Sequence, residues 1–84
     1  MLILRFSKTS AKFLKNCDNQ IYHRIIKKIN ELQTNPFPQD SKRIEGRTDK
    51  TFRIRVGDYR IIYLIIKETN TLIIADINKR QRIY

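Results

Sequence analysis

The stretch that decides the fold is residues 51–63, which read TFRIRVGDYRIIY. Apolar and polar side chains alternate on both sides of Gly57-Asp58. A two-residue connection of this kind joins the strands of a tight β-hairpin, because glycine accepts a positive φ without steric cost. The short turn also fixes the register, so Arg55 is expected directly opposite Arg60.

The two faces of this hairpin differ in character, because successive side chains of a strand point to opposite sides. One face collects the apolar residues Phe52, Ile54, Val56, Tyr59, Ile61 and Tyr63. The other face collects the cations Arg53, Arg55 and Arg60. Like charges directly opposite each other are destabilising in a sheet. The cluster therefore indicates that these arginines bind a polyanion, which neutralises their charge, and argues against a purely structural role.

The composition indicates a single small, basic domain over residues 1–84. Hydrophobic residues make up 40% of the chain, and 18 Lys and Arg against 8 Asp and Glu give a net charge of +10. A domain of this size buries only about 60% of the surface of its unfolded chain, so its core is small. The charge predicts an acidic partner, either nucleic acid or an acidic protein.

Several function classes are excluded by what the sequence lacks. The single cysteine, Cys17, excludes an internal disulfide and a thiolate metal cluster, and we predict no metal and no other cofactor. The apolar residues 1–6 are too few for a signal peptide, and no apolar run approaches the length of a membrane span. We therefore expect a cytoplasmic protein without a membrane partner.

The chain before the hairpin predicts one strand and two helices. Residues 2–6 suggest a short strand, after which Ser7 is the expected N-cap of a helix that ends at about Lys15. Asp18 is the expected N-cap of a second helix, in which apolar residues recur at helical spacing. Asn35-Pro36 ends this helix, because proline disfavours helical geometry in the residue before it.

The remaining segments complete a small sheet. Residues 39–50 are polar and irregular, and they carry four cations immediately before the hairpin, Lys42, Arg43, Arg47 and Lys50. The second hairpin strand runs over residues 59–67 and the last strand over residues 71–78, with a turn at residues 68–70 in which asparagine can take the left-handed conformation. The predicted fold is α+β in the order β-α-α-β-β-β, with a two-helix hairpin on one face of a mostly antiparallel sheet.

The register of the last hairpin depends on the length of its loop. A two- or four-residue loop places Arg60 opposite Lys79, and it turns Asp76, Asn78 and Arg80 toward the core. A three-residue loop places Arg60 opposite Asn78, and it turns the same three polar residues to the arginine face. We adopt the second register because it keeps polar side chains out of the core. It turns Ile73, Ala75 and Ile77 to the helices. It also leaves an apolar patch exposed, the mark of a partner site, made of Ile62, Leu64, Ile66, Leu72 and Ile74.

Residues 52–63, with Asn35-Pro36 upstream and the C-terminal run KRQRIY of residues 79–84, resemble the RelE/ParE superfamily of toxin–antitoxin toxins, and its RelE-like branch in particular. The resemblance covers nearly the whole chain. It implies a bacterial or archaeal toxin that cleaves mRNA in the ribosomal A site. It also implies a small RelB-like antitoxin with an acidic or amphipathic helix, which covers the open sheet face in a toxin–antitoxin hetero-oligomer.

The resemblance also assigns roles to residues. In the RNA-cleaving branch the working side chains are cations on the first hairpin strand, an arginine after the hairpin tyrosine, an arginine near the C-terminus and a terminal tyrosine. The catalytic assignments are therefore Arg60, Arg80 and Tyr84. The RNA-binding assignments are Arg53 and Arg55, to which we add Lys50, Arg47 and Arg82. Antitoxin binding is expected at Ile62, Leu64, Leu72 and Ile74. Some members use a C-terminal histidine, but His23 is the only histidine here and lies on the second predicted helix.

Cleavage of this kind is attack by the RNA 2′-hydroxyl on the scissile phosphate, which needs a base, an acid and cations around the phosphorane. Arginine suits the last role, because it is always charged and offers a planar fork to phosphate. Tyr84 within an arginine cluster is a candidate base, and Arg80 is a candidate acid. Three alternatives stay open: a gyrase-inhibiting toxin of the ParE branch, a non-catalytic nucleic-acid-binding relative, and a Tyr84 that only packs.

Overall fold

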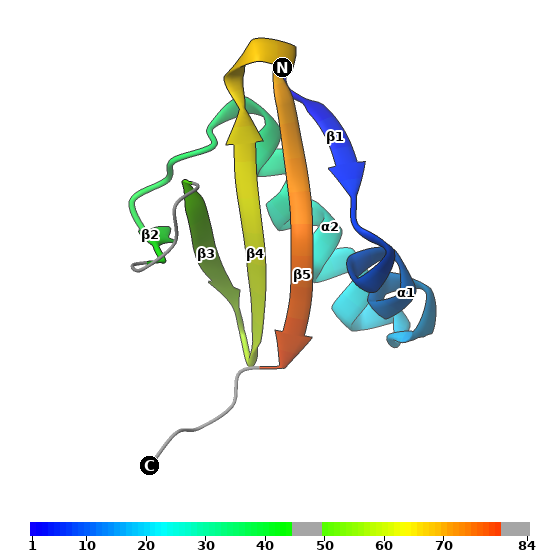
Figure 1. Cartoon of the computed structure of the whole chain (residues 1–84). Coiled ribbons are helices and arrows are strands. Elements are labelled where there is room, and N and C mark those ends of the chain that lie inside the picture. The colour runs from blue at the N-terminus through cyan, green and yellow to red at the C-terminus, as the bar shows by residue number, and fades with distance from the viewer. Residues whose placement is uncertain (45–49, 80–84) are drawn as a thin grey trace.

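The computed structural model describes residues 1–44 and 50–79 (Figure 1). The elements in chain order are β1 (Ile3–Phe6), α1 (Lys8–Asn16), α2 (Asn19–Thr34), β2 (Lys42–Arg43), β3 (Thr51–Val56), β4 (Tyr59–Ile66), a 3₁₀ turn η1 (Lys67–Thr69) and β5 (Thr71–Lys79). The predicted α+β class and element order are confirmed. Strand β2 was not predicted, because two residues are too few to show an alternating pattern.

The strands form one sheet in the order β1-β5-β4-β3-β2. β1 runs parallel to β5 and the other pairs are antiparallel, so the expected mostly antiparallel sheet is confirmed. Both helices lie against the same face of the sheet, and the opposite face is open (Figure 1). The core between helices and sheet consists of Ile25, Ile29, Leu32, Ile54, Ile61, Tyr63, Leu72, Ile74 and Ile77.

Both predicted helix N-caps are present. Ser7 Oγ accepts a hydrogen bond from the Ser10 N–H at 3.1 Å, and Asp18 Oδ1 accepts one from the Ile21 N–H at 2.9 Å. Each cap satisfies a backbone donor that the first turn of a helix leaves without an intrahelical partner. The second helix ends at Thr34, immediately before the predicted stop. Within the described residues, neither helix is long and apolar enough to span a bilayer.

The first hairpin has the predicted register. Val56 pairs with Tyr59, and Arg55 pairs with Arg60. Gly57 has a φ of 59°, which is the positive value expected of glycine at the first position of a type II′ turn. The arginine face of the hairpin therefore forms as predicted, on the side of the sheet away from the helices.

The last hairpin corrects the prediction in part. Ile66 pairs with Thr71, so the connection has four residues, and Asn70 takes the left-handed conformation expected of the turn asparagine. A register shift then follows between Ile62 and Tyr63, which restores the predicted pairing of Arg60 with Asn78. Ala75 is the extra residue on β5, as in a β-bulge.

This bulge reverses the predicted faces of the turn end of β5. Leu72 and Ile74 are fully buried beneath the helices, so their predicted place on the open face is wrong. Ile73, which was expected to face the helices, is only partly buried and pairs with Leu64 on the open side. The prediction failed because it assumed one uniform register, whereas each half of the strand has its own. Ile77, beyond the bulge, is buried as predicted.

Candidate functional site

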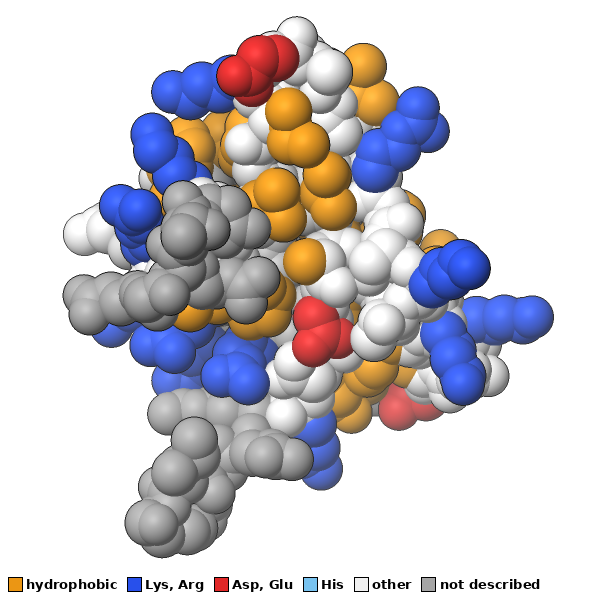
Figure 2. Space-filling model, viewed as in Figure 1, with side chains coloured by type: hydrophobic (Ala, Val, Ile, Leu, Met, Phe, Trp, Pro, Cys, Tyr) orange, Lys and Arg blue, Asp and Glu red, His pale blue; other side chains and the backbone are white. Residues whose placement is uncertain are grey.

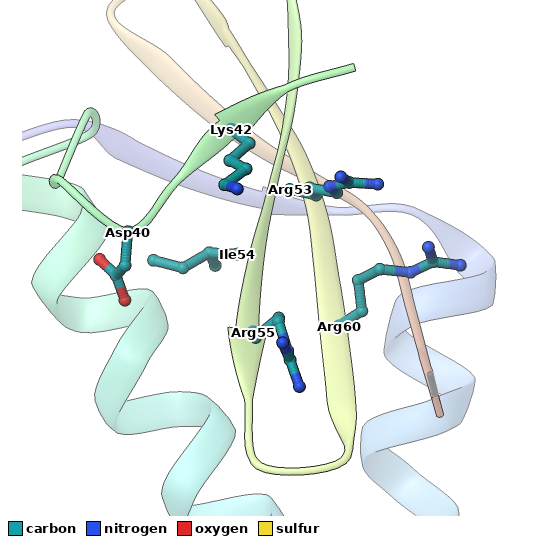
Figure 3. Close-up of a pocket in the computed structure, with 6 residues that line it drawn as sticks. All are labelled: Asp40, Lys42, Arg53, Ile54, Arg55 and Arg60. Atoms are coloured by element: carbon teal, nitrogen blue, oxygen red, sulfur yellow. The ribbon is translucent and has the colours of Figure 1, made fainter. Parts of the chain in front are cut away.

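Cations gather at the hairpin end of the open face. Arg55 lies directly opposite Arg60, and Lys42 on β2 lies directly opposite Arg53. Residues paired in this way point to the same side of a sheet. One hollow brings these side chains together, and it is lined by Asp40, Lys42, Arg53, Ile54, Arg55 and Arg60. Figure 3 shows Arg53 and Arg60 projecting from one side of the hairpin and Ile54 from the other.

The cations of the cluster form no ion pair with the described residues, although Asp40 also lines the hollow and Asp76 lines a neighbouring one with Arg53 and Arg60. Ion pairs in that part of the chain are those of Lys28, with Glu31 at 3.4 Å and with Asp40 at 3.8 Å. Arg53 and Arg55 are exposed, and Arg60 is partly buried. Adjacent cations that lack counterions raise the local positive potential, which attracts an anion. The arrangement suits phosphate, because the arginine fork can bind two of its oxygens.

One neutral contact holds Arg60. Its Nε donates to Asn78 Oδ1 at 3.3 Å, and Asn78 Nδ2 in turn donates to Asp76 Oδ2 at 2.8 Å. The other guanidinium nitrogens of Arg60 make no hydrogen bond or ion pair with any residue in the described ranges. They remain available to an anion.

The structure brings together only part of the predicted catalytic and RNA-binding set. Arg53, Arg55 and Arg60 share the hollow, and Lys50 is exposed just before β3. The predictions for Arg47, Arg80, Arg82 and Tyr84 fall outside the described residues. Lys42 was not assigned to the site, and only its pairing with β3 reveals that it belongs there. His23 lies exposed on α2, as expected.

An apolar strip lies on the open face beside the cation cluster (Figure 2). It is formed by partly exposed side chains of β4 and β5 and by Ile3, which is 51% exposed at the β1 edge; the strip residues are Ile3, Ile62, Leu64, Ile66 and Ile73. Of the four residues predicted to bind an antitoxin, Ile62 and Leu64 lie in this strip. Leu72 and Ile74 do not, because they are buried in the core.

Two other kinds of reactive site, a nucleophilic thiolate and a metal centre, find no support among the described residues. Burial raises the pKa of the Cys17 thiol, which disfavours the nucleophilic thiolate. Among residues 1–44 and 50–79, His, Cys, Asp and Glu side chains do not come together in groups of three or more that could hold a metal ion. The cation cluster therefore remains the candidate site among the described residues.

Comparison with known proteins gives consistent matches along the chain. The family described as "ParE toxin of type II toxin-antitoxin system, parDE" matches residues 4–84. A relative from Methanocaldococcus jannaschii, named "Putative toxin RelE1", is 31% identical over 80 residues, which span 92% of this chain and 88% of that protein.

Solved structures show the same architecture. A chain of the archaeal RelE-RelB complex from Pyrococcus horikoshii OT3 is 27% identical, with a TM-score of 0.83 and 98% of each chain covered. A chain of the RelB-RelE antitoxin-toxin complex from Methanococcus jannaschii is 33% identical, with a TM-score of 0.71, and the match covers 90% of this chain and 89% of that one.

Proposed function

Because this chain belongs to the RelE/ParE superfamily of type II toxin–antitoxin toxins, we propose that it is an endoribonuclease that cleaves mRNA on the ribosome and so inhibits translation. The observation that carries this proposal is the cluster of Lys42, Arg53, Arg55 and Arg60 in one hollow, where they form no ion pair with the described residues. An RNA backbone supplies the missing negative charge, and it does so at regular spacing.

In the proposed reaction, the 2′-hydroxyl oxygen of one nucleotide attacks the adjacent phosphorus. The bond to the 5′-oxygen of the next nucleotide breaks, which leaves a 2′,3′-cyclic phosphate and a 5′-hydroxyl. The nucleophile belongs to the substrate, so no water has to be activated. Arg60 stabilises the charge that develops on the phosphorane, because its terminal nitrogens make no hydrogen bond or ion pair with the described residues. Arg53, Arg55 and Lys42 hold the flanking phosphates.

Proton transfer is assigned to residues outside the described part of the chain. Tyr84 stays the candidate base and Arg80 the candidate acid, as the family resemblance predicts. Cations alone orient and stabilise but accept no proton, so this site by itself is a weak catalyst. Placement of the mRNA by the ribosome supplies the remaining acceleration, because a fixed reactive geometry removes much of the entropic barrier.

The proposal includes an antitoxin on the open face. The similar structures from Pyrococcus horikoshii and Methanococcus jannaschii are complexes of RelE with RelB. A small acidic or amphipathic partner matches the open face here, because the apolar strip borders the cation cluster. Ile62 and Leu64 remain proposed contacts, and Ile73 takes the place of Leu72 and Ile74.

The test is inducible expression in cells, followed by mapping of mRNA 5′ ends. We expect cuts within translated codons. Arg60→Ala should reduce cutting by about 100- to 1000-fold, the effect of losing one donor to a developing oxyanion. Lys27→Ala is the matched control, because it removes an exposed cation from α2 and should leave cutting unchanged. A DNA-damage response without mRNA cuts would overturn the proposal in favour of a gyrase inhibitor, and RNA binding without cuts would indicate a non-catalytic relative.

A further inference from the structure

The hydrogen bond between Arg60 and Asn78 has a defined direction. Arg60 Nε–H can only donate, so its partner must present an acceptor. The amide of Asn78 has one oxygen and one NH₂ group, and a half-turn of the amide exchanges them. Asp76 settles the choice, because its carboxylate accepts from Asn78 Nδ2 at 2.8 Å and so leaves Oδ1 for Arg60. Asp76 is also the one acidic residue in the described strands.

Asparagine at position 78 holds Arg60 without neutralising it. An aspartate there would form an ion pair with the guanidinium and would compete with phosphate for it. The Asn78 amide binds only Nε, so the full charge and the terminal nitrogens stay available. Asp76 forms no ion pair within 4.0 Å with the described cations, since the ion pairs of that part of the chain belong to Lys28.

The bulge on β5 places this pair on the arginine face, and the start of α1 holds the bulge. Ser7 Oγ donates to the carbonyl of Ala75 at 2.7 Å, and the buried Ser10 Oγ donates to the carbonyl of Ile74 at 2.8 Å. The Ser7 N–H also donates to the Ile74 carbonyl at 3.0 Å. Two successive carbonyls at the bulge, those of Ile74 and Ala75, are therefore bonded by the segment that begins α1, which holds the bulge and so the position of Asn78.

From this geometry we propose that Asn78 is a positioning residue, which orients the Arg60 guanidinium for the phosphorane, and that Asp76 sets the amide orientation that this requires. The inference rests on the proposed function, because it concerns the geometry of the same phosphate site. It assigns neither residue a contact with RNA.

The kinetic test uses purified toxin on programmed ribosomes. Asn78→Ala keeps every cation, so it should lower kcat by about 10- to 100-fold, the loss expected from a misplaced catalytic group, and leave KM nearly unchanged. Asn78→Asp should raise KM as well, because it pairs with Arg60. Asp76→Asn should lower kcat less than Asn78→Ala does, because the Asn78 amide is still present and keeps its oxygen toward Arg60 part of the time. Asn30→Ala is the matched control, because it removes the same side chain from an exposed site on α2.

A second measurement does not depend on cleavage. The Arg60 Nε–H signal in a ¹H–¹⁵N spectrum of the free toxin should exchange slowly with solvent, and Asn78→Ala should accelerate that exchange several-fold, whereas Asn30→Ala should not. A loss of this protection with unchanged kcat would overturn the positioning role. An unchanged signal would overturn the contact itself.

The two proposals fail in different ways. If the wild-type protein does not cleave, the proposed function fails, and titration with a single-stranded RNA oligonucleotide then decides the inference. RNA should shift the Arg60 signal in the wild type and shift it less in Asn78→Ala. Equal shifts would refute the positioning role. If the wild type cleaves and Asn78→Ala cleaves equally fast, the inference alone is wrong.

Discussion

The β5 bulge makes a sharp prediction for two adjacent isoleucines. Ile74 is fully buried beneath the helices, whereas Ile73 lies in the apolar strip of the open face. Ile→Ala removes three carbons, and at about 0.8 kcal/mol per buried CH₂ this lowers the free energy of unfolding by about 2.4 kcal/mol at position 74. The cavity adds to the loss, so a total of about 3 kcal/mol is expected. At position 73 the same change should cost about 1 kcal/mol or less, because part of the side chain is already in water.

The pair is well matched, because both substitutions change strand propensity and side-chain volume equally. For a domain of this size, 1 kcal/mol corresponds to roughly 4–8 °C in Tm, so Ile74→Ala should lower Tm by about 12–24 °C. Thermal and urea unfolding of both variants provide the measurement. Conversely, Ile73→Ala should weaken antitoxin binding more than its small effect on stability explains. Equal destabilisation by the two changes, or a larger effect at position 73, would refute the described faces of β5.

Three further outcomes follow from single contacts. Arg55→Gln removes a like charge opposite Arg60, so it should raise the free energy of unfolding by about 0.2–1 kcal/mol. The same change should weaken RNA binding, and the slope of the logarithm of the binding constant against the logarithm of the salt concentration should become shallower by about one unit. Unfolding and salt-titrated binding measure both effects. Asp18→Ala removes the N-cap of α2 and should cost about 0.5–2 kcal/mol of unfolding free energy, whereas Asp58→Ala, in the exposed hairpin turn, should cost little. Burial raises the pKa of Tyr63, so the folded protein keeps the phenol neutral where the unfolded chain ionises it. The contribution of Tyr63 to the free energy of unfolding is therefore fully present below about pH 10, the pKa of an unperturbed tyrosine, and is lost as the pH rises through the folded pKa. Tyr63→Phe removes the ionisable group, so the free energy of unfolding should fall less at alkaline pH in this variant than in the wild type. Unfolding measured over a range of pH provides the test.

Local signals in the sequence were sufficient for most of the fold. The Gly57-Asp58 turn determined the first hairpin register, because a two-residue loop leaves no freedom in pairing. Ser7 and Asp18 marked the helix starts, because their side chains satisfy the first backbone donors. Each of these features depends on a few neighbouring residues, so a single sequence reveals it.

Features that depend on distant residues were not predictable in the same way. The bulge at Ala75 is held by Ser7 and Ser10, which lie more than sixty positions earlier in the chain. No pattern within residues 71–79 predicts the bulge. Leu72 and Ile74 were for that reason wrongly predicted to be exposed on the open face. The place of Lys42 in the cation cluster was unpredictable for the same reason, because it depends on the pairing of β2 with β3.

β5, the last of the described strands, lies in the interior of the sheet, between β1 and β4. β1 therefore has no sheet partner until β5 has been synthesised, and the core that Leu72, Ile74 and Ile77 complete cannot close earlier. Asn78, which holds Arg60, arrives in the same final segment. During synthesis the cations of β2, β3 and β4 therefore emerge before the strand that completes the sheet and before the Asn78 side chain that bonds Arg60.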